Sequence, residues 1–137
     1  EINSALKGFI AAMKASGIWD SVVIASSSDF GRTLTSNSNA GSDHSWASHH
    51  FIAGGSVKGG QVFGHYPQTL EPDGNIILGR GRVVPTTADE AYWNGILEWF
   101  GVKDSELDHV LPNRKRTARL FTEEDMFDRN GGTERAN

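Results

Sequence analysis

The chain has 137 residues, of which 37% are hydrophobic and 22% are charged, and it contains no cysteine. This length and composition fit one globular domain, while the lack of cysteine excludes disulfides, thiolate zinc sites and cysteine nucleophiles. The formal net charge of −4 argues against general nucleic-acid affinity, and no apolar run approaches the ~20 residues that span a bilayer.

The first predicted element is an amphipathic helix that ends near Gly17, a residue suited to a left-handed C-terminal cap. Its apolar face consists of six residues at helical spacing: Ile2, Ala5, Leu6, Phe9, Ile10 and Met13. The sequence begins at Glu1 without an initiator methionine, signal peptide or transit pattern. We therefore expect the chain to be a fragment of a longer protein.

A short apolar run, Ser21–Ser26, follows the helix without alternation of polar and apolar residues. Such a run is typical of a strand that is buried on both faces of a parallel sheet. Helix, turn and buried strand together predict an α/β fold. Because this strand needs neighbours on both sides, we expect Val22–Ala25 to pair with a missing N-terminal segment or a partner chain.

Residues 27–48 are rich in Ser, Asn, Gly and Asp, which predicts a long loop of the kind that often carries function. A short strand is expected at His50–Ala53, and glycines then break the chain into tight turns. We expect a second helix from Thr87, where Thr87 and Glu90 fit a capping box, to a cap at Gly101.

The C-terminal segment, residues 113–137, loses the periodicity of the preceding chain. A basic cluster is followed there by Glu123, Glu124 and Asp125. We therefore divide the chain into a domain portion, residues 1–112, and a tail that is weakly structured or packs on a missing segment.

Carboxylates and histidines gather in and beside the predicted loop: Asp29, Asp43, His44, His49 and His50. Asp29 follows the predicted strand directly, at the kind of strand end where α/β sheets bind ligands. Carboxylate oxygen and imidazole nitrogen together suit Zn, Mn or Fe in hydrolytic sites. If a strand begins at His49–His50, the two rings point to opposite faces and only one reaches the site. The alternatives are a turn-capping role for Asp29 and histidines that bond to the backbone.

Basic residues near this cluster have two interpretations each. Arg32 could hold an anionic group bidentately or form a salt bridge with Asp29. Lys58 lies in a glycine-rich segment that does not match a phosphate-binding loop, so a turn is the favoured interpretation. His65 is isolated, and an ordinary surface or core role is favoured for it.

Ordered motifs along the chain resemble the DUF1501 family. They are Val22–Thr33 with its Ser-Asp-Phe-Gly-Arg-Thr ending, Asn39–Trp46, His49–Phe51, Gly54–Gly60, Gly64–Pro67, Arg82–Thr87 and Glu98–Val102. The resemblance covers about residues 1–113, and it corresponds to the C-terminal third of a typical member. It implies the C-terminal portion of an alkaline-phosphatase-like sheet with flanking helices.

The same resemblance implies a branch of the alkaline phosphatase and sulfatase superfamily, in which Asp29 corresponds to a metal-binding aspartate. Asp43 and His44 resemble the Asp-His ligand pair of that superfamily, and Ser45 and Ala47 stand where the family has glycines. The implied cofactor is a divalent metal (Zn, Mn or Ca), and the implied location is periplasmic or secreted. The nucleophile would come from the N-terminal part of the family domain.

Two functions follow as hypotheses. The first is a metal-dependent hydrolase of phosphate or sulfate esters, with Asp29, Asp43, His44 and one of His49 and His50 as ligands. Arg32 would position the anionic group of a small ester substrate in this catalytic site. The second is a non-catalytic scaffold or binding protein that keeps the superfamily fold, since fold alone does not define function.

Overall fold

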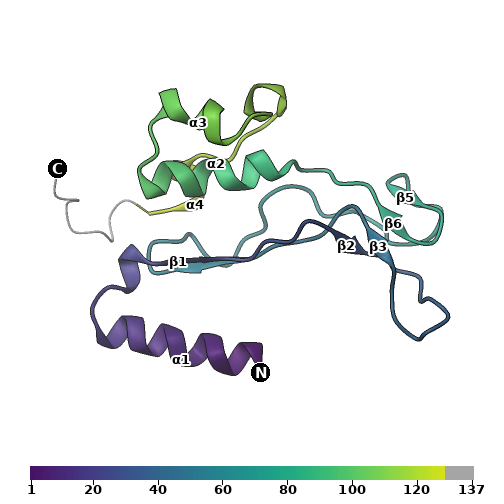
Figure 1. The fold of residues 1–137 in the computed structure, drawn as a ribbon, viewed down its shortest axis with the longest axis horizontal. Coiled ribbons are helices and arrows are strands. Elements are labelled where there is room, and N and C mark those ends of the chain that lie inside the picture. The colour runs from purple at the N-terminus through teal and green to yellow at the C-terminus, as the bar shows by residue number, and fades with distance from the viewer. Residues whose placement is uncertain (129–137) are drawn as a thin grey trace.

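The structure is a computed structural model, which describes residues 1–128 of the chain. Figure 1 shows helices and short strands in an elongated arrangement. Within the described residues the helices are α1 (Ile2–Ala15), η1 (Trp19–Ser21, a 3₁₀ turn), α2 (Asp89–Phe100), α3 (Asp104–Val110), η2 (Arg114–Arg116, a 3₁₀ turn) and α4 (Glu123–Met126). The strands are β1 (Val23–Ala25), β2 (Gly31–Arg32), β3 (His44–Ser45), β4 (Ile52–Gly54), β5 (Ile77–Leu78) and β6 (Arg82–Val83).

Helix α1 confirms the first predicted element. Its end has the expected left-handed glycine, Gly17 at φ 69°. The Gly17 N–H donates to the Lys14 carbonyl and the Ile18 N–H to the Met13 carbonyl, the pair of bonds that defines a Schellman cap. No residue of α1 is buried, and Figure 1 shows the helix on the opposite side of β1 from α2. The apolar face of α1 therefore contributes little to the core of the described chain.

Strand β1 does not have the parallel neighbours that the sequence predicts. It pairs antiparallel with β4, with Val23 opposite Gly54 and Ala25 opposite Ile52, and within residues 1–128 it has no second partner strand. All three of its residues are half-buried. A run of β-branched residues indicates that a strand is partly buried, but it does not indicate whether the strand pairs parallel or antiparallel with its neighbour. The mixed α and β class is confirmed, and the strands described here form three two-stranded antiparallel ladders.

The hydrophobic core lies between α2 and the β1–β4 ladder. Ala91 and Ile96 of α2 are buried there, and half-buried side chains of the ladder such as Val23 and Ile52 pack against them. At the end of the ladder the Tyr92 hydroxyl donates to the Ser26 carbonyl at 3.1 Å. Burial raises the pKa of Tyr92 to about 12, so this donor keeps its proton at physiological pH.

The described part of the tail belongs to the same core, and the division into residues 1–112 and a tail stays a prediction. Phe121, Met126 and Phe127 are all buried in the core cluster with α2. Phe127 bridges to Val57, and the Lys58 ammonium donates to the Glu124 carbonyl at 2.5 Å. Apolar residues spaced irregularly along a segment can still be buried, because the segment crosses α2 without forming a long helix of its own. Residues 129–137 of the predicted tail lie outside the described part.

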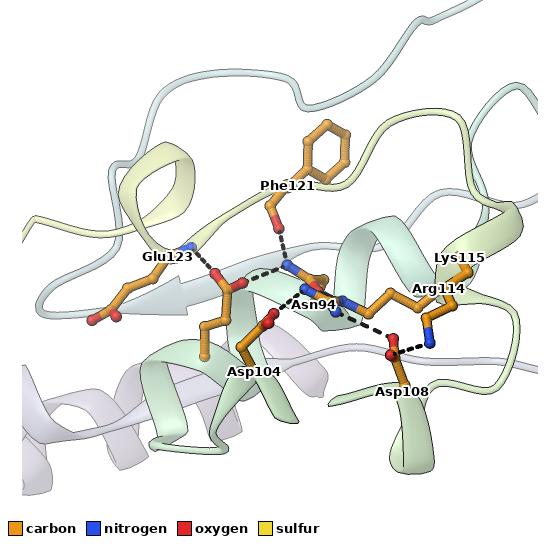
Figure 2. A network of polar contacts seen from close by, with 8 residues as sticks. Asn94, Asp104, Asp108, Arg114, Lys115, Phe121 and Glu123 are labelled. Atoms are coloured by element: carbon orange, nitrogen blue, oxygen red, sulfur yellow. Dashed lines mark hydrogen bonds and ion pairs between the residues drawn. The ribbon is translucent and has the colours of Figure 1, made fainter. Parts of the chain in front are cut away.

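A buried asparagine joins α2 to the segments that follow it, as Figure 2 shows. The Asn94 side chain, 1% exposed, donates to Glu98 Oε1 at 2.9 Å and to the Phe121 carbonyl at 3.0 Å. Its carbonyl oxygen accepts from Arg114 Nε at 2.7 Å. Arg114 also pairs with Asp104 and Asp108 of α3. One side chain of α2 thus connects α3, η2 and the start of α4.

Helix α2 begins later than predicted and without the expected capping box. Its N-cap is Ala88, which has no side chain able to accept a hydrogen bond, and the first turn is instead rich in acid through Asp89 and Glu90. Acidic residues in the first turn stabilise a helix through its dipole. The C-terminal end is as predicted, with Gly101 in the left-handed region at φ 99°.

Two helical glycines, Gly95 in α2 and Gly8 in α1, distinguish the effect of packing on stability from the effect of helix propensity. Replacing Gly95 by Ala improves propensity by about 1 kcal/mol, but its Cβ would lie 2.6 Å from Met126 Sδ and 2.7 Å from the Thr122 carbonyl oxygen. We expect Gly95→Ala to destabilise the chain by about 1–3 kcal/mol, the range for overpacking. Gly8→Ala is the control, because nothing lies within 4 Å of that Cβ. Urea unfolding measures both, and equal stabilisation of the two variants would contradict the close packing of α2 on α4.

Removal of the Asn94 amide tests the polar network. Asn94→Ala leaves Arg114 Nε and the Phe121 carbonyl without their buried partner, which we expect to cost about 2–3 kcal/mol in the free energy of unfolding. Gln68→Ala, at an exposed position, is the control. An unchanged urea midpoint in Asn94→Ala would show that the network contributes no net stability.

Candidate polar site on two hairpins

The predicted loop closes on itself through a short hairpin. Strands β2 and β3 pair antiparallel, with Arg32 opposite His44 and Gly31 opposite Ser45. Gly31 is required by contact, because a Cβ there would lie 1.8 Å from the Ala47 carbonyl oxygen. The Ser45 hydroxyl is buried and has no hydrogen-bond partner within the described residues. The hairpin therefore places two residues of the predicted site, Arg32 and His44, side by side.

Asp43 is held from two sides at the start of β3. Asn37 Nδ2 donates to Asp43 Oδ1 at 3.0 Å, and Arg80 pairs with Asp43 Oδ2 at 2.6 Å. The Asp43 N–H donates to the Thr33 hydroxyl at 3.0 Å. The hydrogen bond from Asn37 lowers the pKa of Asp43 most, Arg80 and then Arg32 lower it further, and partial desolvation opposes them. The carboxylate is thus anionic, and each of its oxygens has a partner.

Arg80, which the sequence analysis did not single out, comes from the turn between β5 and β6. Its backbone has φ 67°, and the next residue, Gly81, has φ 70°. A left-handed backbone costs a residue with a side chain about 1–2 kcal/mol. The Gly81 carbonyl accepts from the Leu34 N–H at 2.9 Å, and the Val83 carbonyl accepts from the Ala47 N–H at 3.0 Å. The available signal was the Gly-Arg-Gly turn at residues 79–81 between two short apolar segments.

Arg32 and His44 share an aromatic neighbour. The Phe30 ring stacks on the His44 ring with centroids 4.1 Å apart, and the Arg32 guanidinium carbon lies 5.1 Å from the Phe30 centroid. Arg32 donates to the Ser42 carbonyl at 3.1 Å. Within residues 1–128 Arg32 has no ion pair, so the alternative of a salt bridge with Asp29 is not realised.

The other predicted ligands lie apart from this hairpin or have no shared contact with it. The His50 ring packs against Tyr92 of α2, with centroids 5.7 Å apart. Asp29 and His49 are exposed. No group of three or more His, Asp or Glu side chains placed to hold a metal occurs within the described chain. As the side chains lie, they do not fit a divalent metal, and the predicted ligand set of Asp29, Asp43, His44, His49 and His50 stays a prediction.

Lys58 and His65 make contacts with other parts of the chain. The Lys58 side chain donates to the tail, and its own N–H donates to the Met126 carbonyl at 2.9 Å. The His65 carbonyl accepts from the Thr86 hydroxyl at 2.8 Å. His65 also lines a cleft with Asp73 and Asn75, beside the start of β5.

The fold and site define a mixed α and β protein whose helical core supports a polar site on two small hairpins. Over residues 1–72 the chain matches the family described as "Protein of unknown function (DUF1501)", and it belongs to that family. A search of curated proteins and a search of solved structures each gave no match. The match includes β2, β3 and β4 but ends before Arg80, so the resemblance predicted for residues 73–113 stays a prediction.

None of the helices within residues 1–128 combines the length and apolar composition needed to cross a membrane.

Removal of the Asn37 amide should raise the pKa of Asp43 toward its ordinary value of 3.8, because Asn37 is the largest cause of its lowering. A lowered pKa means that Asp43 adds stability above pH 3.8, which is lost as the pH falls through the lowered value. Carbon-13 NMR titration of the Asp43 carboxyl in Asn37→Ala measures the change. Ser38→Ala, at the exposed neighbouring position, is the control. If Asp43 titrates identically in Asn37→Ala and in Ser38→Ala, the assigned hydrogen bond is contradicted.

Proposed function

We propose that this chain is part of an exported hydrolase of phosphate or sulfate esters that resembles the alkaline phosphatase and sulfatase superfamily. The observation that carries the proposal is the pairing of β2 with β3, which gathers Arg32, Asp43 and His44 on one hairpin. The family resemblance assigns Asp43 and His44 to a site, and the chemistry of Arg32 predicts that it positions the anionic group. Membership of the DUF1501 family supports the resemblance over the segment that contains them.

The chemistry of the hairpin suits an anionic ester. Arg32 carries a guanidinium with a planar fork of N–H donors that matches phosphate and sulfate oxygens. Its side chain is exposed on the hairpin, beside the imidazole of His44. Arg32 would orient the ester, and His44 would donate or accept a proton at a neighbouring oxygen. The segment that supplies the nucleophile, and that completes an alkaline-phosphatase-like sheet, would lie outside this chain.

A divalent metal belongs to this proposal through the resemblance alone. When bound, such a metal neutralises charge on the transferred group. The described residues do not fit it as they lie, because both oxygens of Asp43 already have partners and His50 packs on Tyr92. As the side chains lie, the residues of this chain contribute anion recognition, and a role for Asp43 as a metal ligand would need Asp43 to leave Asn37 and Arg80.

A second function, a non-catalytic scaffold or binding protein, is favoured by a different observation. Asp43 is closed by Arg80 and Asn37, and the His44 ring is stacked on Phe30. Side chains satisfied in this way stabilise a loop, and they need no metal or substrate to do so. Under this alternative the contacts of Asp43 serve only to hold the two hairpins together.

Replacement of Asp43 by Asn separates the two functions. It keeps size and hydrogen bonding but removes the anionic charge. For a metal hydrolase we expect Asp43→Asn in the full-length protein to reduce metal content and ester turnover by at least about tenfold. Elemental analysis and the hydrolysis of an aryl phosphate and an aryl sulfate measure the effect.

Asp73→Asn is the matched control, because it removes an exposed carboxylate that has no ion pair within the described residues. Lys58→Ala should also change turnover little. A wild-type protein that binds no divalent metal and hydrolyses neither ester supports the scaffold. Equal turnover by wild type and Asp43→Asn removes this loop from the mechanism.

A further inference from the structure

Two arginines from separate hairpins lie near one carboxylate. Arg80 pairs directly with Asp43 at 2.6 Å, and Arg32 donates to the carbonyl of Ser42, the residue that precedes Asp43, so that its charge also acts on this carboxylate. The three groups carry a local net charge of +1 in a chain whose formal net charge is −4. An excess of positive charge at this place attracts anions against the general charge of the protein.

The backbone fixes the two arginines relative to each other. Arg32 is placed by the β2–β3 ladder, while Arg80 is placed by the left-handed turn after β5. The hydrogen bond from the Leu34 N–H to the Gly81 carbonyl joins the two hairpins next to both residues. In the closed form of the hairpins, the backbone positions of the two arginines are therefore set before any ligand arrives.

Both arginines retain unused donors and access to solvent. The Arg80 side chain is 54% exposed and that of Asp43 is 41% exposed. Within the described chain, hydrogen bonds and ion pairs engage one nitrogen of Arg80 and one of Arg32, whereas a guanidinium carries five N–H donors. An ion pair this exposed is weak, because water and salt screen it. A stronger anion can therefore take the place of Asp43.

We propose that Arg32 and Arg80 form a binding site for a tetrahedral oxyanion, the phosphoryl or sulfuryl group of an ester, and that Asp43 is its competing internal counter-ion. A carboxylate and a phosphoryl group accept the same forked donation from a guanidinium, so one can replace the other. Arg80 thus adds a second guanidinium to the anion site that is proposed above for Arg32. The identity of the ligand as an ester rests on the proposed function, whereas the binding of the oxyanion does not.

Calorimetric titration of the full chain with inorganic phosphate, with sulfate and with phenylphosphonate tests the site. A chelator is present throughout, so a bound metal cannot supply the affinity. Phenylphosphonate mimics an ester and is not hydrolysed, so tighter binding of it than of phosphate identifies an ester ligand. The reverse order identifies the free anion as the ligand and still supports the oxyanion site.

Substitutions at this site can change its charge and still keep the left-handed turn at Arg80. Arg80→Asn removes the guanidinium and tolerates the left-handed turn, and we expect it to weaken phosphate binding by about tenfold, as Arg32→Gln should. Arg80→Lys keeps the charge and should restore part of the affinity. Asp43→Asn removes the competitor and should tighten binding severalfold. Arg82→Gln is the control, because Arg82 on the same hairpin bonds within its own turn.

Unchanged phosphate affinity in Arg80→Asn overturns the proposal, as does weaker binding in Asp43→Asn. Absence of saturable binding to the wild-type chain also overturns it, provided that circular dichroism shows the same fold in every variant. These outcomes are distinct from failure of the hydrolase, which is read from metal content and turnover. In that assay Asp43→Asn loses activity, whereas in this one it gains affinity.

Discussion

The buried amide of Asn94 is the interaction on which the helical half of the structure depends. This side chain contacts Glu98 on its own helix, Arg114 of η2 and the Phe121 carbonyl (Figure 2). Glu98 in turn accepts from the Glu123 N–H at 2.7 Å, at the start of α4. Since α3, η2 and α4 are short, none of them is stable alone, and their positions follow from this shared connection to α2.

The helical core packs on the β1–β4 ladder, and the β2–β3 hairpin of the polar site is formed by the chain between those two strands. Tyr92 reaches from α2 to the Ser26 carbonyl at the end of that ladder, and the His50 ring packs against it. His44 instead stacks on Phe30 in the β2–β3 hairpin. Tyr92 and Phe30 thus hold two histidines that are six residues apart in the sequence in different surroundings.

Local signals in the sequence were reliable where the chain itself determines the geometry. The apolar spacing that ends at Gly17 predicted α1, and Gly101 predicted the end of α2, because a left-handed residue favours glycine in any context. The predicted start of α2 was wrong, because acidic residues in the first turn stabilise the helix without a cap from Thr87. The direction of β1 and the role of Arg80 depend on residues far away in the sequence, Ile52–Gly54 and Asp43, and no local pattern reports such partners.

The β2–β3 ladder consists of only two residue pairs, and Figure 1 shows it away from α3 and α4. Few backbone bonds and partial exposure place a segment at the low end of the range of local opening free energies, whereas the buried centre of α2 opens only with the whole domain. The hairpin can therefore fluctuate between closed and open forms while the core stays folded. Any ligand that selects the closed form rigidifies the hairpin, so its apparent affinity reports the population of that form as well as the contacts it makes.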